Sequence, residues 1–131
     1  MDEFNNWDKI ADAFEAEVDK VITTSASHVK TGFQARVHVR TGFLRDSAYE
    51  VTSSTSTHGQ CPQSPHLMRE VARPDDKHTT IVAIGADYGV IEEMGGTHHP
   101  AHPSLMPAVE AERPAFDAGL DAIEQKLGSV K

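Results

Sequence analysis

The first third of the chain places apolar residues at steps of three and four, the spacing that lines one face of an amphipathic helix. Asn5 or Asn6 can cap the start of this helix, and Gly32 is a natural place for it to end or kink. A helix from about Asn6 to Thr31 would be roughly 39 Å long at 1.5 Å per residue. The apolar face is made of Phe4, Trp7, Ile10, Ala11, Phe14, Val18, Val21, Ile22 and Val29.

A helix of this length matches or exceeds the size of its own domain. A compact domain formed by 131 residues has a diameter of only about 35 Å. Two interpretations follow. The helix lies across a sheet of the same chain, or a neighbouring subunit buries part of its apolar stripe.

The next stretch, residues 33–40, permits two structures. It can continue the helix, or it can form a short extended piece, because Val37 and Val39 alternate with polar and charged residues. Thr41 then has the side chain of a helix cap, so we expect a brief turn through residues 42–47.

Two strands are predicted in the middle of the chain. Residues 49–57 are rich in β-branched and aromatic side chains and are expected at a sheet edge. Residues 79–85 have a continuous apolar centre, which is typical of a strand in the middle of a sheet. The two would form an antiparallel pair, with a long surface loop (about residues 58–78, rich in proline and poor in periodicity) inserted between them.

A second long helix closes the chain. Ser104 or Pro107 can begin it, and Gly128 can end it. Pro114 falls inside and removes a backbone donor, so we expect a kink near Arg113. The fold class is therefore α+β, with a single domain over residues 1–131. The apolar side of this last helix is made of Leu105, Val109, Phe116, Leu120, Ile123 and Leu127.

The charge is acidic and unevenly spread. The formal net charge is -8, which argues against a protein that binds nucleic acid by neutralising phosphates. Residues 1–19 hold seven acids and one base (a sum of -6), whereas residues 28–50 hold four bases and two acids (a sum of +2). This asymmetry suits head-to-tail docking of identical subunits, and it equally suits a solvated acidic face.

Three further features bound the environment. Cys61 is the only cysteine, so the chain cannot form an internal disulfide and suits a reducing compartment. No apolar run approaches the roughly 18 residues needed to span a membrane. The first residues are acidic, unlike a signal peptide. We therefore expect synthesis in the cytoplasm and no membrane partner.

Histidines offer the most obvious chemistry. His98, His99 and His102 lie close together, and Cys61 could supply a fourth zinc ligand. Yet the standard pairs of zinc ligands are missing, and the neighbouring prolines hold the segment off a helix. A solvated hinge or a subunit contact is the favoured interpretation, and a small metal-binding domain or enzyme is the alternative.

Other catalytic arrangements find less support. Adjacent carboxylates such as Glu92 and Glu93 diverge on a helix, so one of them is expected to cap a helix or to pair with Arg45. The serines and the single cysteine lack a recognisable nucleophile context. We therefore expect no enzyme activity and no cofactor.

Two groups of residues recur in a fixed order. The first group is a Thr-Gly-x-Leu-Arg-x-Ser motif, made of Thr41, Gly42, Leu44, Arg45 and Ser47. The second group follows the strand at 79–85 and leads through a proline-rich hinge into the last helix. It comprises Tyr88, Glu92, Gly95, Gly96, Thr97, Pro103, Leu105, Pro107 and Ala108.

This order resembles the neck or tail-completion proteins of long-tailed, lambda-like bacteriophages (siphoviruses). The likeness covers roughly residues 41–127, although Ser104 stands where the family often has Phe, and Gly96 and Pro114 are departures from the pattern. The resemblance implies a structural virion protein of the head–tail connector with an α+β fold. It also implies a homo-oligomeric, hexamer-like ring that contacts connector, head-closure, tail-terminator or tail-tube proteins and touches genomic DNA only in passing. The two motifs would then serve as structural and interface residues.

Overall fold

The computed structural model describes residues 2–37, 42–61 and 69–128. Its fold is α+β, as predicted, with a long N-terminal helix, a small antiparallel sheet and a C-terminal helix. The elements in chain order are α1 (Asp2–Arg36), α2 (Phe43–Asp46), β1 (Ala48–Val51), the 3-10 turn η1 (His58–Gln60), β2 (Ile81–Ile84), α3 (Gly89–Met94) and α4 (Leu105–Gly128).

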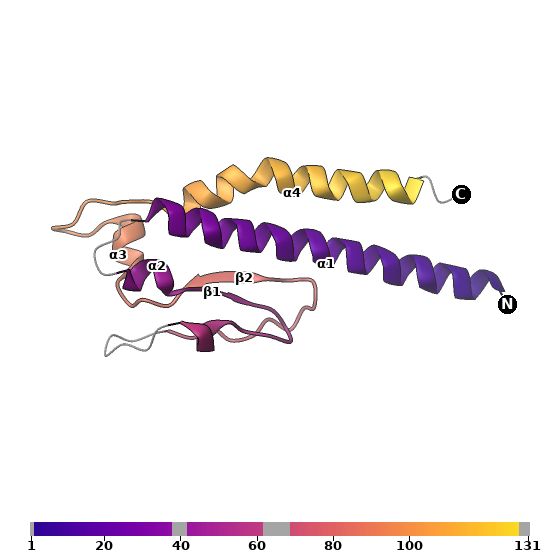
Figure 1. Cartoon of the computed structure of the whole chain (residues 1–131), viewed down its shortest axis with the longest axis horizontal. Coiled ribbons are helices and arrows are strands. Elements are labelled where there is room, and N and C mark those ends of the chain that lie inside the picture. The colour runs from indigo at the N-terminus through magenta and orange to yellow at the C-terminus, as the bar shows by residue number, and fades with distance from the viewer. Residues whose placement is uncertain (1, 38–41, 62–68, 129–131) are drawn as a thin grey trace.

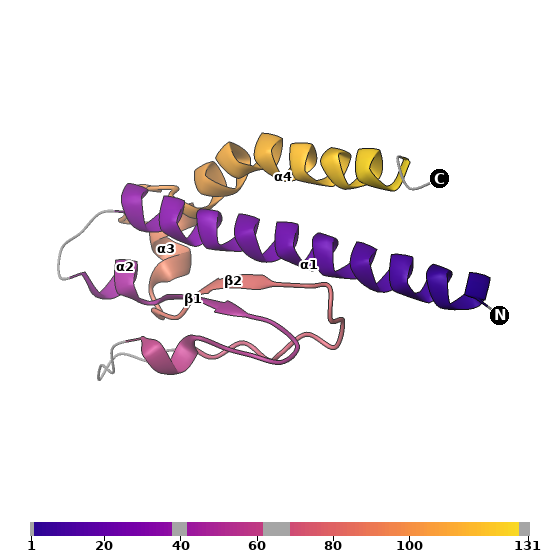
Figure 2. The ribbon, with the colours of Figure 1, turned by 45° about the vertical axis from the view of Figure 1, so that its right-hand side comes forward.

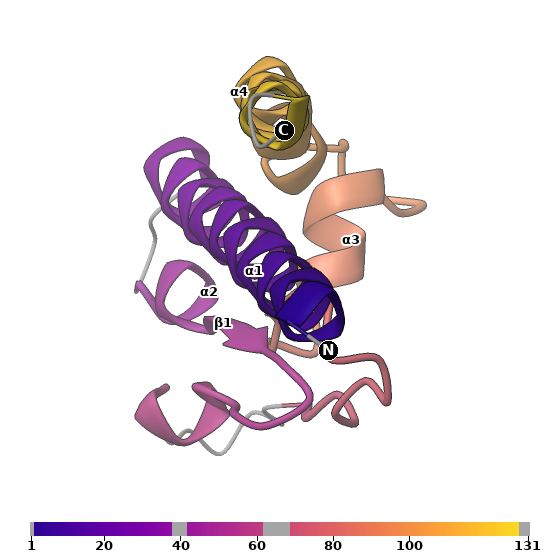
Figure 3. The ribbon, with the colours of Figure 1, turned by 90° about the vertical axis from the view of Figure 1, so that its right-hand side faces the viewer.

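Helix α1 is the middle layer of the molecule. Helix α4 lies on one side of it and the two strands lie on the other (Figures 1 and 3). Helix α4 runs back along α1, so the start of α1 and the end of α4 share one end of the molecule. The short helices α2 and α3 lie at the opposite end (Figure 1).

Helix α1 is longer than predicted and does not stop at Gly32. It continues to Arg36, and Val37 closes the last turn by donating its N–H to the Phe33 carbonyl at 2.9 Å. The glycine marks instead the place where α4 crosses, since a Cβ added to Gly32 would lie 3.2 Å from the Ala108 Cβ. The expected end was wrong because this glycine serves a close helix contact. Residues 38–40 and the predicted cap Thr41 lie outside the described residues.

The first turns of α1 have few contacts within the chain, since the ion pairs to later parts of the molecule begin at Glu15, which lies 3.0 Å from Lys77. With 35 residues, the helix is about 52 Å long. Among its described side chains, burial begins only at Ala26, whereas Trp7 is 70% exposed and Phe14 is 41% exposed. Figure 2 shows the first turns of α1 extending beyond both α4 and the sheet, while α4 runs beside the rest of the helix.

The two strands pair in antiparallel fashion, with Tyr49 opposite Ala83 and Glu50 opposite Val82. The first strand is shorter than predicted, because the chain turns at Thr52, whose hydroxyl oxygen accepts the Thr55 N–H at 3.0 Å. The predicted strand over residues 49–57 is thus strand β1 followed by a segment that turns back and pairs with it.

Strand β2 is likewise confined to four residues, and it is one of two strands in the described sheet instead of a central one. Of the predicted loop at 58–78, residues 62–68 lie outside the described residues.

The sheet carries a separate core on each face. The face toward α1 joins Val82 and Ile84 to the main core, whose buried members are Val29, Phe33, Val37, Leu44, Ala48, Ala86 and Ala108. The other face buries Tyr49, Val51, Cys61 and Ala83. The Tyr49 hydroxyl donates to the Arg69 carbonyl at 2.7 Å and accepts the Val71 N–H at 2.9 Å, which fixes the segment that leads back to β2.

Helix α4 begins at Leu105, directly after Ser104, and ends at Gly128, as predicted. It bends in its N-terminal half (Figures 1 and 2), where Pro114 cannot donate a backbone hydrogen bond. Glu112 ties α4 to α1, since its carboxylate accepts from the Ser25 hydroxyl at 3.1 Å and lies 3.0 Å from His28 Nδ1.

Candidate functional site

The first motif forms helix α2 and its two ends. Gly42 stands before the helix with φ of 82°, a left-handed conformation that favours glycine. Leu44 is buried in the main core. The Ser47 hydroxyl, also buried, donates to the Leu44 carbonyl at 2.7 Å and so closes the helix. These three residues have structural roles.

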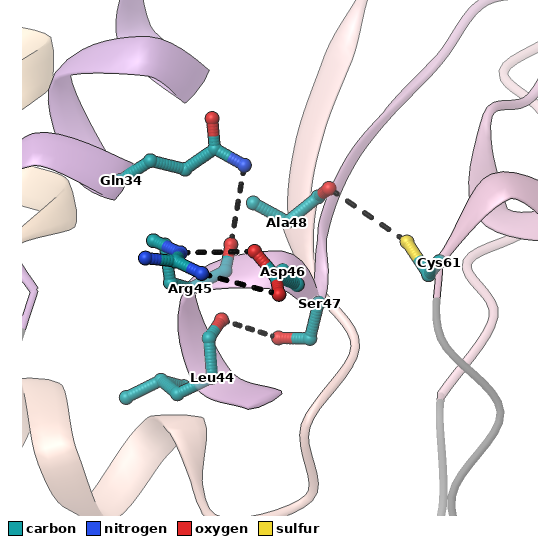
Figure 4. A network of polar contacts seen from close by, with 7 residues as sticks. All are labelled: Gln34, Leu44, Arg45, Asp46, Ser47, Ala48 and Cys61. Carbon is teal, nitrogen blue, oxygen red and sulfur yellow. Dashed lines mark hydrogen bonds and ion pairs between the residues drawn. The ribbon is translucent and has the colours of Figure 1, made fainter. Parts of the chain in front are cut away.

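The polar residues around α2 are satisfied locally (Figure 4). Arg45 pairs with the neighbouring Asp46 at 2.9 Å, and Gln34 of α1 donates to the Arg45 carbonyl at 3.2 Å. Of the two roles expected for Glu92 or Glu93, pairing with Arg45 is therefore not found, whereas helix capping is confirmed for Glu93, as described below. Behind β1, the Cys61 thiol lies 3.7 Å from the Ala48 carbonyl, and burial raises the pKa of this thiol.

The second motif packs against the first. The Tyr88 and Phe43 rings lie 6.2 Å apart at an angle of 41°. Tyr88 and Leu105 pack on the core that contains Leu44 and Ala108. Burial, followed by the nearby carboxylates, raises the pKa of Tyr88. Residues from both motifs therefore meet in one apolar cluster at the end of the molecule formed by α2 and α3.

The glycine pair stops α3. Gly95 has φ of 82° and ψ of 165°, and a Cβ added there would lie 3.0 Å from the backbone nitrogen of Ala101. Gly96 instead exchanges backbone hydrogen bonds with His99, which places the exposed Thr97 in a tight turn. This turn brings the chain back toward α3 before α4 starts.

The most informative contact of the hinge is made by Glu93. Its carboxylate accepts the N–H groups of Ser104 (2.8 Å), Leu105 (2.9 Å) and Met106 (3.1 Å). The next residue is Pro107, which has no N–H to satisfy. The first turn of α4 therefore leaves no backbone donor without a partner, a requirement that every helix start must meet. Burial acts to raise the pKa of Glu93, but the three N–H donors outweigh it and hold this pKa below its usual value.

Glu93 was missed by the sequence motif, which contains Glu92. The Glu92 carboxylate lies 3.3 Å from His99 Nε2, and its backbone carbonyl accepts the His102 N–H at 2.7 Å. Glu92 thus holds the turn, whereas Glu93 holds the helix. The sequence predicted that Glu92 or Glu93 would cap a helix, but it did not distinguish the two.

Large apolar side chains are exposed on both sides of the hinge. Three are on α3 and one is in the first turn of α4, and Pro103 lies exposed in the hinge between the two helices. They are Val90 (68% exposed), Ile91 (49%), Met94 (76%) and Met106 (54%). Single exposed apolar residues are ordinary, but several at one end of a molecule indicate a contact surface.

The described residues do not assemble a metal centre or a catalytic pair. No three His, Cys, Asp or Glu side chains among them come together as metal ligands. The histidines at 98, 99 and 102 lie exposed along the hinge. The hydroxyls of the two buried serines donate to backbone carbonyls, Ser47 to Leu44 and Ser104 to His102. The arrangement can hold the chain firmly where it turns from α3 into α4, and it presents an apolar surface there.

Comparisons with known proteins add no assignment. No family model, no curated protein and no solved structure matches the chain. In the described part of the chain, no helix is both long enough and apolar enough to cross a membrane.

Proposed function

We propose that the chain is a structural subunit of the head–tail connector of a long-tailed bacteriophage, a neck or tail-completion protein that forms a ring around the DNA conduit. The proposal rests on the order of the two motifs. It is supported by their packing: Leu44, Tyr88, Leu105 and Ala108 belong to one cluster, so residues far apart in the sequence serve one structural unit.

The charge supports a conduit role. A net charge of -8 disfavours adhesion to duplex DNA, which must pass through the neck without being held. The exposed apolar residues supply surfaces for neighbouring subunits. Trp7 and Phe14 lie toward the free end of α1, whereas Val90 and Met94 lie at the opposite end of the molecule. Two different contact surfaces on one subunit are what a head-to-tail ring requires.

The decisive experiment removes the gene from the phage genome that encodes the chain. Under the proposal, filled heads and complete tails accumulate without joining, and adding the purified protein restores joining. Mass spectrometry of purified wild-type particles should also detect the chain as a virion component. Normal joining in the deletion strain contradicts the proposal.

A matched complementation separates folding from assembly. Met94→Lys places a charge on an exposed side chain of α3, and Arg113→Lys leaves the exposed charge of α4 unchanged. We expect the second variant to restore joining fully and the first to restore it poorly, with both proteins folded by circular dichroism.

A further inference from the structure

The hydrogen-bond pattern of the sheet leaves one edge of β2 open. Gly85 donates its N–H to the Ser47 carbonyl across the pair at 2.9 Å. In an antiparallel pair, residues alternate between those that bond across it and those that face outward. The backbone N–H and carbonyl groups of Val82 and Ile84 therefore point away from β1.

The partner strand gives independent support for this register. Glu50, directly opposite Val82, directs its backbone away from β2, since its N–H and carbonyl both bond to Thr57. Ala48, opposite Ile84, likewise offers its carbonyl to Cys61. The outer edge of β1 is thus closed by the chain itself, whereas Val82 and Ile84 make no further backbone hydrogen bond with any described residue.

Two apolar hollows lie along this open edge. The first, of about 460 Å³, lies between β2, α1 and α4 and is lined by Val82, Val109 and Phe116 among others. The second, of about 470 Å³, lies between the end of β2 and α3 and is lined by Ile84 and Met94 among others. Leu105 lines both, and no β1 residue lines either. Figure 3 shows α3 and α4 on the side of α1 away from β1.

We propose that this furrow, the β2 edge groove, binds an extended segment of a different protein, which adds to β2 as a third, antiparallel strand. Edge pairing supplies backbone hydrogen bonds, and pockets beside the edge accept alternate side chains. Because Val82 and Ile84 face α1, the bound segment directs every second side chain into the two hollows. Those side chains are apolar, because most of the residues that line the hollows are apolar; the exceptions are His78, Thr79 and Thr80 in the first hollow and Arg69, Asp87 and Glu93 in the second.

The chain's own described segments do not supply this strand. Residues 52–57 already pair with β1, and residues 69–71 are held by the Tyr49 hydroxyl. Glu93 is occupied by the start of α4 and His78 by Asp19, so Arg69 and Asp87 are the charged groups left at the rim. The β2 strand of a second copy does not fit either, because its side chains already pack in the two cores of that copy and cannot enter the hollows. A different protein with a free arm is the occupant that fits, and the inference holds whether or not that protein belongs to a virion.

The test uses a labelled octapeptide, acetyl-Lys-Val-Thr-Ile-Thr-Val-Thr-Lys-amide, and two methylated versions of it. In the antiparallel register, the N–H groups of the Val and Ile residues point at β2 and those of the Thr residues point away. Methylation of the Val and Ile nitrogens should weaken binding at least about tenfold, and methylation of the Thr nitrogens should leave it unchanged. Equal effects of the two methylations, or no binding of the parent peptide, overturn the proposal.

Variants of the protein provide the matched control. Val82→Pro removes the outward N–H and should weaken peptide binding at least about tenfold, whereas Val82→Ala keeps that N–H and loses only core packing. Hydrogen exchange gives a readout that does not depend on either variant. The Val82 and Ile84 amides should exchange quickly in the free protein and become protected with peptide, while Ala83 is protected in both. Protection of Val82 without peptide, or protection that rises with protein concentration, overturns the proposal in favour of a second copy.

Discussion

At the scale of single residues, Glu93 determines how the last helix is attached. One carboxylate satisfies three N–H groups at the start of α4. We expect Glu93→Ala to lower the free energy of unfolding by about 1–2 kcal/mol, the usual effect of losing a helix cap. Urea denaturation at pH 7 measures this. The control is Glu92→Ala, which removes a partly exposed contact with His99 and should cost less than about 0.5 kcal/mol.

The same carboxylate makes stability depend on pH. The pKa of Glu93 is lower in the folded chain than the value of about 4.3 for a free glutamate, so the unfolded state binds more protons between these two values. The stability that Glu93 contributes is therefore complete above about pH 4.3 and is lost as pH falls through the folded-state pKa. Urea midpoints from pH 6 to pH 3 should fall more for the wild type than for Glu93→Gln. Parallel curves would argue against this linkage.

The two hinge glycines should respond differently to the same substitution. Gly95 combines positive φ with extended ψ, a region that is almost closed to other residues, and a new Cβ would press on Ala101. Gly95→Ala should cost about 2 kcal/mol or more. Gly96 has no such φ, and its nearest neighbour would be Ile91 Cγ2 at 3.5 Å, so Gly96→Ala should cost about 0.5 kcal/mol or less. Chemical denaturation of the pair decides between them, and equal losses would contradict the assignment.

Sequence patterns predicted residues with local roles and missed those with distant partners. Gly95 as a helix stop and Pro107 in a first turn follow from backbone chemistry alone. The choice of Glu93 over Glu92 as the cap and the contacts of Tyr49 do not, because the partners of these two residues lie 11 to 13 and 20 to 22 residues away and are brought together only by the fold. Glu92 and Glu93 look equivalent in the sequence, and only the path of the hinge distinguishes them.

At the scale of elements, the crossing of α1 and α4 depends on small residues. Gly32 faces Ala108, and Gly119 lies so close to Val21 that an added Cβ would be 3.0 Å from its side chain. The same feature explains why the end of α1 was mispredicted. Glycine lowers helix propensity by about 1 kcal/mol, and this local signal indicated an end where the fold uses a close contact.

Gly32→Leu tests this crossing. Although leucine favours the helix, its side chain has no space beside Ala108, so we expect a net loss of about 1–2 kcal/mol. The matched control is Ala35→Leu, an exposed position one turn later in α1, which should be nearly neutral. Denaturation monitored by circular dichroism measures both. Equal stability of the two variants would show that α4 can move aside freely.

At the scale of the whole molecule, the unusual feature is a helix that leaves its own domain. The sequence predicted a helix as long as the domain is wide, and left open whether a sheet or a neighbouring subunit covers it. The first interpretation holds for most of α1, which packs within its own chain, and the second stays a prediction for the exposed first turns. Most of α1 packs on the strands or lies beside α4, whereas its first turns extend past both, and Trp7 and Phe14 are exposed. An isolated helical segment of this length gains little stability by itself, so a partner is expected there.

Deleting residues 2–12 tests whether that partner is another subunit. These turns bury no described side chain, so the isolated monomer should change by no more than about 0.5 kcal/mol in a denaturant titration. Self-association should be lost, as measured by light scattering at concentrations where the full chain associates. Trp7→Ser combined with Phe14→Ser should act in the same way and keeps the length of the helix. If both altered chains assemble like the wild type, the projecting stripe is not a subunit contact. If the full chain is itself monomeric at every concentration, the ring in the proposed function is wrong, and the β2 edge groove becomes the surface on which to seek a partner.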